Sequence, residues 1–418
     1  MTRVFAAGRA ALLLSLLTGC NACSGGTKIT PGPEEVRVAD PASTGASGAS
    51  GASVASADAA APAGLRSCVL VKNGHGEAGT VPIRAEVIAS GLEVPWGIAF
   101  LPGGDALITE RPGRVRLLRQ GKLVPGPVAT IGIGDSGEGG LLGIAAHPDV
   151  AKNGFLYLYI TTGDPPKNRV ERWKYDAGAA RASRVDVILD GIPAAKNHDG
   201  GRLRFGPDGM LYIGTGDGQQ PEAAQDPKSL SGKLLRLTPD GKVPPDNPTP
   251  ESPVFVSGIR NTQGFDWLDD KTLVISDHGP SGEYKGRRGH DEVSVARAGQ
   301  NLGWPTIYGC ESGAGLVQPS ISWEEANPPG GAALYKGDAI PQWRGSLLLG
   351  SLKGEHLHRI GIDASGQVSS HDVYLANTYG RLREVIMGPD GRLYVTTSNC
   401  DGRGTCPPEK DRVLVIVR

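Results

Sequence analysis

One stretch of the sequence holds a histidine and an aspartate that suit proton transfer. The stretch is NHDGGRLRFGPDGMLYIGTGD, residues 197–217, in which Asp217 follows His198 by nineteen positions. Histidine is the side chain best suited to act as a general base near neutral pH. A carboxylate on its second ring nitrogen fixes the tautomer and stabilises the imidazolium that forms. We therefore predict that His198 is a general base and that Asp217 orients it.

Further polar residues stand in turns where strand packing has no need of them. These segments are GIRNTQG with Arg260 and Asn261, DHGPSG with Gly279 and Pro280, SLKG with Lys353, and YGRLREV with Arg381 and Arg383. Three arginines and a lysine converge at low cost only where anionic groups neutralise them, because unpaired charges are expensive to bury. The set therefore indicates a small ligand that carries several carboxylates or phosphates.

The elements that must position these residues repeat along the chain. Each copy is a turn rich in Pro, Asp and Gly followed by a short apolar run, which is the signal of a strand and its hairpin. One leucine keeps its place in every run, and the six are Leu107, Leu156, Leu211, Leu273, Leu347 and Leu393. Their spacing averages about 57 residues, and a repeat of this kind is typical of propeller blades of four strands. We predict an all-β fold, a six-bladed β-propeller over residues 66–418. An irregular β-sandwich with similar turns is the alternative.

The N-terminal residues predict export and a lipid anchor. Residues 1–19 combine two arginines with the apolar run AALLLSLL, and the motif LTGC that ends at Cys20 resembles a bacterial lipobox. The resemblance implies cleavage before Cys20 and attachment of lipid to its sulfur, with an ordinary signal peptide as the alternative. Residues 20–65 are rich in Gly, Ala and Ser and predict a flexible linker. We expect a lipid-anchored protein on the periplasmic side of a bacterial membrane, or in its cell envelope.

Charge and motifs narrow the choice of partners. Removal of residues 1–19 takes away two arginines and no acidic residue, so the formal charge changes from −1 to −3. A net charge so close to neutral argues against nucleic acid as a partner. No Gly-rich dinucleotide fingerprint follows a strand and opens a helix, which argues against a nicotinamide enzyme.

The six cysteines suit an exported protein, in which disulfides persist. With Cys20 assigned to lipid, Cys400 and Cys406 bracket the loop NCDGRGTCP and are predicted to form a disulfide. The sequence leaves open whether Cys68 pairs with Cys310.

Seven stretches, taken together and in order, carry a family resemblance. They are GLEVPWGIAFLPGGDALITERPGRVRLL (91–118), GEGGLLGIAAHPD (137–149), NHDGGRLRFGPDG (197–209), GKLLRLTPDGKVPPDNP (232–248), GIRNTQGF (258–265), GQNLGWP (299–305) and YGRLREVIMGPDGRLY (379–394). The chain resembles the soluble aldose dehydrogenases that depend on pyrroloquinoline quinone (PQQ), the glucose/sorbosone dehydrogenase family. The resemblance implies a six-bladed propeller with PQQ over the central channel beside Ca²⁺. It also implies an aldose sugar as substrate and a separate, external electron acceptor.

The resemblance assigns a role to each polar residue named above. His198 takes the place of the general base and Asp217 that of its partner. Quinone contacts fall on Arg260, Asn261, Lys353, Arg381 and Arg383, and the backbone carbonyls of Gly279 and Pro280 fall at the calcium. Calcium prefers oxygen ligands, and as a Lewis acid it would polarise the quinone carbonyl that receives a hydride. We therefore expect oxidation of the C1 hydroxyl of an aldose to a lactone.

The chain departs from the family pattern at several positions. Glu138 stands at the quinone site where the glucose enzymes have glutamine, and a carboxylate beside an anionic cofactor requires calcium or an arginine to compensate. The segment SGEYKGRRGHDE after Pro280 is longer and more basic than the usual link, and it is expected to reshape the substrate entrance. Trp323 is expected to cover the site, with a buried core tryptophan as the alternative.

Two other functions stay open on the sequence alone. A calcium-dependent propeller hydrolase, such as a lactonase, would draw its calcium ligands from side-chain carboxylates and amides. A non-catalytic carbohydrate-binding propeller would have no use for His198, Asp217 and the cation set.

Overall fold

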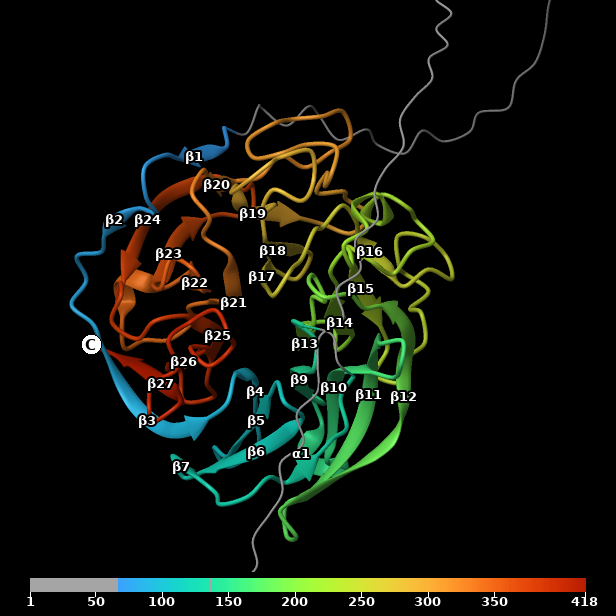
Figure 1. The fold of residues 1–418 in the computed structure, drawn as a ribbon, viewed down its shortest axis with the longest axis vertical. Coiled ribbons are helices and arrows are strands. Elements are labelled where there is room, and N and C mark those ends of the chain that lie inside the picture. The colour runs from blue at the N-terminus through green and yellow to red at the C-terminus, as the bar shows by residue number, and fades with distance from the viewer. Residues whose placement is uncertain (1–66, 135–136) are drawn as a thin grey trace, which may run out of the picture. The chain divides into compact units, whose positions relative to one another are not determined.

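Six sheets arranged in a ring around a central axis make up the part of the chain that the structure describes (Figure 1). The structure is a computed structural model, and it describes residues 67–134 and 137–418. The predicted signal peptide, the linker and Cys20 lie outside the described residues. Within those ranges, no helix has the length and apolar character needed to cross a membrane.

In each sheet, four strands pair antiparallel in order from the axis outward, and these four-stranded units are blades 1 to 6. The first three blades contain β4 (Pro95–Phe100), β5 (Ala106–Glu110), β6 (Arg114–Arg119), β7 (Lys122–Leu123) and β8 (Ala129–Thr130); β9 (Leu141–Ala146), β10 (Phe155–Thr162), β11 (Lys167–Asp176) and β12 (Arg181–Pro193); and β13 (Leu203–Phe205), β14 (Leu211–Gly214), β15 (Leu234–Leu237) and β16 (Val254–Val256). The last three contain β17 (Gly264–Asp269), β18 (Thr272–Asp277), β19 (Asp291–Ala296) and β20 (Ile321–Trp323); β21 (Pro329–Leu334), β22 (Ser346–Ser351), β23 (Leu357–Ile362) and β24 (Val368–Tyr374); and β25 (Leu382–Met387), β26 (Leu393–Thr397), β27 (Asp411–Val417) and β3 (Arg84–Leu92). The described helices are the short α1 (Val150–Asn153), η1 (Pro221–Ala224) and η2 (Pro341–Trp343).

The repeat that predicted the propeller marks one strand of every blade. The six leucines lie on β5, β10, β14, β18, β22 and β26, which is the second strand from the axis in each blade, and all six are buried. The hairpin before β14 shows why the turn sequence recurs. Asp208 accepts the N–H of Met210 through Oδ1 at 3.0 Å, and Gly209 adopts φ +74°, a left-handed conformation that favours glycine. The six-bladed propeller is confirmed, and the sandwich alternative is wrong.

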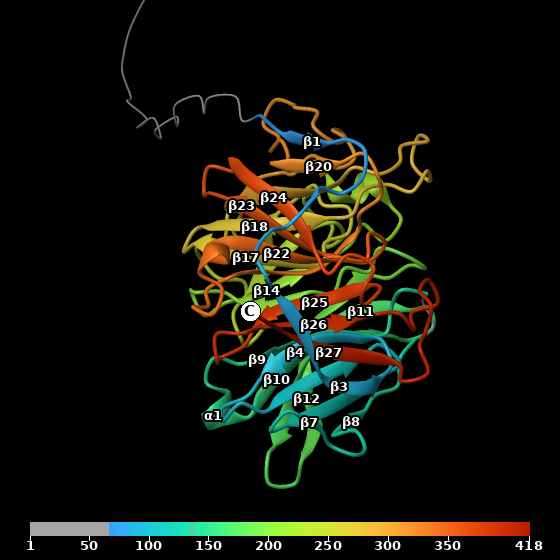
Figure 2. The ribbon, with the colours of Figure 1, turned by 90° about the vertical axis from the view of Figure 1, so that its left-hand side faces the viewer.

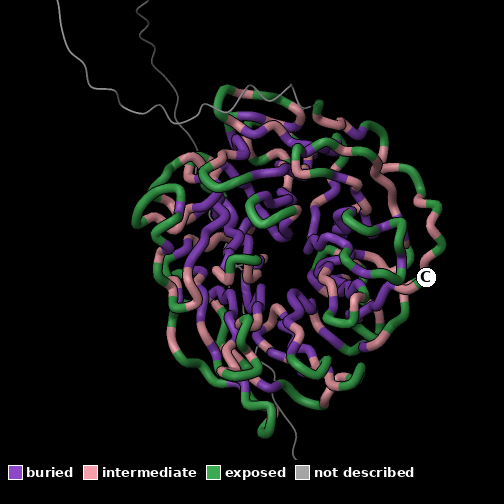
Figure 3. Tube along the Cα trace, turned by 180° about the vertical axis from the view of Figure 1, so that it is seen from behind, coloured by how far each residue is buried: buried purple, intermediate pink, exposed green. Residues whose placement is uncertain are grey.

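The apolar core lies between the blades rather than inside one of them. Among the described residues, six buried apolar clusters join neighbouring blades around the ring. Figure 3 shows buried segments through the body of the ring and exposed segments at its rim. Because both faces of every blade are covered, the strands read as nearly continuous apolar runs, as in the FLYLYI run that opens β10.

The N-terminal part of the described chain runs around the ring as an outer strap. Its strands β1 (Val69–Val71) and β2 (Glu77–Ala78) add in parallel to the outer edges of blades 4 and 5. Next along the chain, β3 pairs antiparallel with the C-terminal β27 and so closes the ring (Figure 2). A disulfide between Cys68 and Cys310 joins the strap to the segment before β20. The pairing that the sequence left open is therefore formed.

Blade topology decides which loops meet. In an antiparallel meander, the loop after the second strand and the loop that leads into the next blade emerge at the same end of the ring. His198 precedes β13, Arg260 precedes β17 and Arg381 precedes β25, whereas Asp217, Gly279 and Lys353 follow second strands. All of the predicted polar loops are therefore carried to one end of the channel.

Candidate active site

A cavity of about 770 Å³ lies at that end of the ring. Most of the predicted site residues line it: Glu138, His198, Arg260, Gly279, Pro280, Lys353, Arg381 and Arg383. A second cavity, of about 870 Å³, is lined by the hairpins between first and second strands and contains none of the predicted residues. Because the polar loops converge on the first cavity, it is the candidate active site.

His198 and Asp217 form the predicted pair. The Nδ1 atom of His198 lies 2.7 Å from Oδ1 of Asp217. Since an ionised carboxylate only accepts hydrogen bonds, Nδ1 carries the proton, and Nε2 is left with its lone pair toward the cavity. Nη2 of Arg260 donates to this lone pair at 2.8 Å. The imidazole is therefore held in the tautomer that a general base requires.

Asp217 is itself held by two donors. The indole Nε1 of Trp304 donates to Oδ2 of Asp217 at 2.9 Å, and the backbone N–H of Gln219 donates to Oδ1 at 2.8 Å. Trp304 was not predicted from the sequence, although it lies in the GQNLGWP motif. Its ring contacts the Arg260 guanidinium, whose carbon lies 5.6 Å from the ring centroid, and the ring of Tyr284, at 5.3 Å between centroids. These contacts hold the indole beside Asp217 and Arg260.

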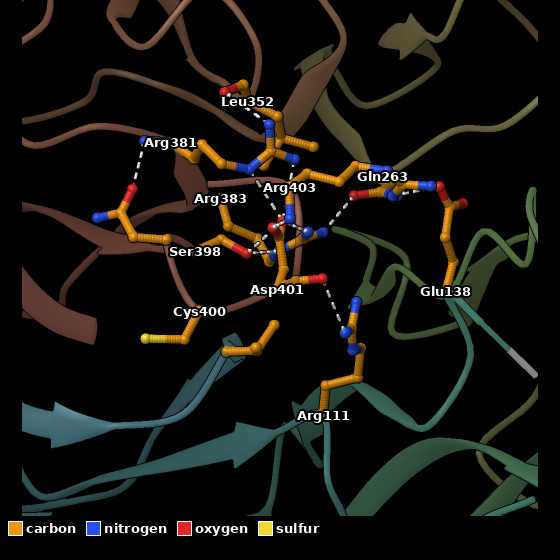
Figure 4. Close-up of polar contacts among 12 residues, drawn as sticks. Arg111, Glu138, Gln263, Leu352, Arg381, Arg383, Ser398, Cys400, Asp401 and Arg403 are labelled. Atoms are coloured by element: carbon orange, nitrogen blue, oxygen red, sulfur yellow. Dashed lines mark hydrogen bonds and ion pairs between the residues drawn. The ribbon is translucent and has the colours of Figure 1, made fainter. Parts of the chain in front are cut away.

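Arg381 and Arg383 share a partner that the sequence analysis missed. Oδ2 of Asp401 accepts from Nε of Arg381 at 3.0 Å and from Nη2 of Arg383 at 3.3 Å. Figure 4 shows Arg381, Arg383 and Arg403 gathered around Asp401, with Arg111 approaching from the other side. Burial lowers the pKa of Arg383 to about 10, which reflects the cost of desolvating its guanidinium, although the Asp401 charge opposes the shift.

The predicted excess of cations is smaller than the sequence indicated. Arg381 and Arg383 pair with Asp401, and Arg260 pairs with Glu283, which comes from the inserted segment after Pro280. Within the described ranges, three cations that line the cavity have no carboxylate within ion-pair distance: Arg111, Arg288 and Lys353. Since these three charges face a cavity, they remain available to an anionic ligand.

Glu138 has the arginine that its charge requires. Its Oε1 lies 2.7 Å from Nη1 of Arg403, and its Oε2 accepts the backbone N–H of His198 at 3.1 Å. Burial acts to raise the pKa of Glu138, but the charge of Arg403 and the His198 N–H outweigh it, so the net shift is downward. Glu138 is therefore ionised and compensated inside the cavity.

Gly279 and Pro280 lie in the wall of the cavity on a loop held by a buried carboxylate. Asp291 accepts the N–H of Gly279 at 2.9 Å, and the carbonyl of Pro280 accepts the N–H of Gly289 at 2.9 Å. Burial raises the pKa of Asp291 to about 6, although the backbone N–H groups of Gly279 and Asn327, which donate to its carboxylate, oppose the shift. Within residues 67–134 and 137–418, no group of three or more His, Cys, Asp or Glu side chains is arranged to hold a metal ion.

Besides Asp217, which is buried behind His198, two predicted residues do not line the cavity. The amide of Asn261 is fully buried beneath it, where Oδ1 accepts the N–H of Gly200 at 2.9 Å, so Asn261 supports the backbone next to His198. Trp323 is also fully buried, packs in the core cluster between blades 4 and 5, and donates from Nε1 to the carbonyl of His75. The prediction that Trp323 covers the site is wrong, because β20 turns the indole into the core.

The comparison with known proteins agrees with this geometry. Residues 92–408 match the profile of the Glucose / Sorbosone dehydrogenase family. The chain belongs to this family. Its membership of the glucose/sorbosone dehydrogenases confirms the family resemblance in the motifs and makes the protein an oxidoreductase of the sugar dehydrogenase type.

The chain is similar to characterised sugar dehydrogenases over most of its length. It is 33% identical over 349 residues to the aldose sugar dehydrogenase YliI of Escherichia coli strain K12, which covers 77% of this chain and 91% of that protein. It is 27% identical over 413 residues to quinoprotein glucose dehydrogenase B of Acinetobacter calcoaceticus, covering 75% of this chain and 84% of the relative. The PQQ-bound structure of aldose sugar dehydrogenase from Streptomyces coelicolor is similar with a TM-score of 0.73 and 36% identity, over 81% of this chain and 99% of that one.

Proposed function

We propose that this protein is a PQQ-dependent aldose dehydrogenase that oxidises the C1 hydroxyl of an aldose to a lactone. The observation that carries the proposal is the pair His198–Asp217, which holds an unprotonated ring nitrogen toward a cavity lined by unpaired cations. Two relatives support the choice of cofactor, since one is named a quinoprotein and the other was solved with PQQ.

The residues of the cavity suit the quinone and a calcium ion. Arg111, Arg288 and Lys353 face the cavity without a carboxylate partner among the described residues, which fits a cofactor with three carboxylates. The backbone oxygens of Gly279 and Pro280 would hold Ca²⁺, a cation that accepts carbonyl ligands in flexible geometry. When bound, the quinone supplies the two-electron acceptor for the hydride from C1, and calcium polarises it.

His198 would handle the proton of the reaction. As the C1–H bond breaks and its electron pair leaves with the hydride, the hydroxyl oxygen forms a double bond to C1, and its proton passes to Nε2 of His198. The carboxylate of Asp217 stabilises the imidazolium through Nδ1 at 2.7 Å. Arg260 now donates to Nε2, so an incoming hydroxyl must displace Nη2 of Arg260 before the base can act.

The same proposal includes the setting of the enzyme. The lipobox and linker in the sequence support anchorage by lipid at Cys20 on the periplasmic side of a bacterial membrane. Two electrons would remain on the protein after each turnover and would pass to an external acceptor.

Reconstitution tests the proposal. The propeller from residue 66 is mixed with PQQ, Ca²⁺ and a panel of aldoses, and dye reduction is followed for wild type, His198→Ala and the matched variant His147→Ala. His147 lies half-buried in a turn outside the cavity, where its Nδ1 accepts the Asp149 N–H. We expect activity that needs both additions, is removed by chelation, and falls about 10²–10⁴-fold only in His198→Ala.

Other outcomes would assign the alternatives. Calcium-dependent hydrolysis of lactones without PQQ would make the protein a propeller hydrolase. Sugar binding with neither quinone binding nor turnover would make it a carbohydrate-binding propeller. Either result would overturn the proposed oxidation.

A further inference from the structure

The loop that carries Arg403 is closed by a disulfide beside the cavity. It connects β26 to β27, and Cys400 and Cys406 form the disulfide that the sequence predicted, with 4.4 Å between their Cα atoms. The backbone of Cys400 is tied inward, because its N–H donates to the buried Asp411 at 3.2 Å. A short loop closed in this way has few alternative conformations.

Asp401 fixes the tip of this loop onto the arginines of the site. Its Oδ1 accepts the backbone N–H of Arg403 at 2.9 Å, while its Oδ2 binds Arg381 and Arg383. Its carbonyl accepts from Nη2 of Arg111 at 3.3 Å. The backbone of Arg403 is therefore held in position by contacts with arginines that line the cavity.

The guanidinium of Arg403 reaches the loop of the general base. It contacts Oε1 of Glu138 at 2.7 Å and Oδ1 of Asn197, the residue before His198, at 3.2 Å (Figure 4 shows Arg403 and Glu138). The other oxygen of Glu138 accepts the backbone N–H of His198. Arg403 thus contacts both Asn197, the residue before His198, and the carboxylate that accepts the His198 N–H.

The backbone of His198 needs such support. His198 has φ +68°, a left-handed conformation that is unfavourable for a residue with a side chain. The side chain of Arg403 is 51% exposed, so solvent screens its ion pair and the pair adds little to global stability. Its effect is instead geometric, because it determines where the carboxylate of Glu138 stands.

We propose that Arg403 is a positioning residue that holds the general base through Glu138, and that the Cys400–Cys406 disulfide keeps it in place. The kinetic consequence rests on the proposed function, whereas the structural consequence does not. Arg403 touches neither the imidazole nor a reacting atom. Its loss should therefore loosen the His198 backbone and slow turnover even when the quinone is saturating.

Hydrogen–deuterium exchange on the protein without added cofactor measures the structural part. Deuterium uptake is compared in the peptide that contains the His198 amide for wild type, Arg403→Gln, Arg403→Lys, Glu138→Ala and the double variant Arg403→Gln/Glu138→Ala. The control Arg392→Gln removes an arginine from a similar exposed ion pair, with Asp390, on the same blade.

The proposal predicts a definite order of effects. Arg403→Gln should speed exchange of that peptide several-fold, Arg403→Lys should recover part of the protection, and Arg392→Gln should match wild type. The double variant should exchange no faster than Glu138→Ala alone, because Arg403 acts through Glu138. In protein reconstituted with saturating PQQ, Arg403→Gln should lower kcat about 10–100-fold. The variant Cys400→Ser/Cys406→Ser should shift exchange in the same direction.

Three results would overturn the proposal or separate it from the proposed function. Wild-type exchange in Arg403→Gln would make Arg403 a surface residue with no positioning role. Loss of PQQ affinity with unchanged exchange would make it a cofactor ligand instead. If wild type oxidises no aldose, the proposed function fails, yet faster exchange in Arg403→Gln would still support the positioning of His198.

Discussion

The carboxylate of Asp217 is the group whose replacement tests the site most directly. Asp217 accepts three hydrogen bonds, from His198 Nδ1, Trp304 Nε1 and the Gln219 N–H, and it is fully buried. Asp217→Asn keeps the shape of the side chain but turns one acceptor oxygen into a donor NH₂ group. In either orientation of the amide, this NH₂ group faces a group that donates a hydrogen bond to Asp217 in the wild-type protein.

Both orientations of the new amide carry a cost. If the NH₂ group faces Trp304, two donors meet in a buried site, which costs about 1–3 kcal/mol of folding stability. If it faces His198, Nδ1 must become the acceptor, and the ring proton moves to Nε2. A protonated Nε2 accepts neither the Arg260 N–H nor a substrate proton. In that orientation the base is lost, and in the other the neutral amide no longer stabilises the imidazolium. In either case we expect kcat to fall about 10²–10⁴-fold.

The assay is steady-state dye reduction with PQQ and calcium, together with thermal unfolding of each variant. Asp226→Asn is the control, since Asp226 lies in an exposed turn of the same loop and accepts the Lys228 N–H. The control should keep wild-type kcat. If Asp217→Asn retains more than about a third of wild-type kcat, the Asp217 carboxylate neither controls the tautomer of His198 nor stabilises its imidazolium, and the reasoning is refuted.

Three further predictions follow from buried contacts. Trp304→Phe removes the donor to Oδ2 of Asp217 and should lower kcat about tenfold with an unchanged fold by circular dichroism, and wild-type kcat would contradict this. Burial lowers the pKa of His356 to about 4, so below pH 6.5 the unfolded state binds the proton more readily than the folded state. In urea unfolding between pH 6.5 and 4, the free energy of unfolding of wild type should therefore fall by about 3 kcal/mol relative to that of His356→Gln. A difference that stays constant with pH would contradict this prediction. Cys68→Ser/Cys310→Ser opens a cross-link that spans 242 residues and should destabilise the protein by about 2–5 kcal/mol, measured as a lower Tm, whereas an equal Tm would show that the strap contributes no constraint.

The general architecture could be predicted because it depends on local patterns. The turn chemistry before each second strand and the leucine that follows it are properties of a few adjacent residues, and Leu107 and Leu393 are buried as their pattern indicated. The pair His198 and Asp217 could also be predicted, since both lie in one blade and are separated by a single hairpin. Local backbone geometry brings such residues together without information from the rest of the chain.

The partners of the site residues were decided by tertiary structure alone. Trp304 reaches Asp217 across 87 positions, and Arg403 reaches Asn197 across 206. Contacts between loops of different blades depend on how the ring closes, and no short sequence pattern encodes that closure. The direction of Trp323 was undetermined for the same reason. The residue types and order of the chain determined a propeller with a polar end, and the packing of its blades decided which charges meet there.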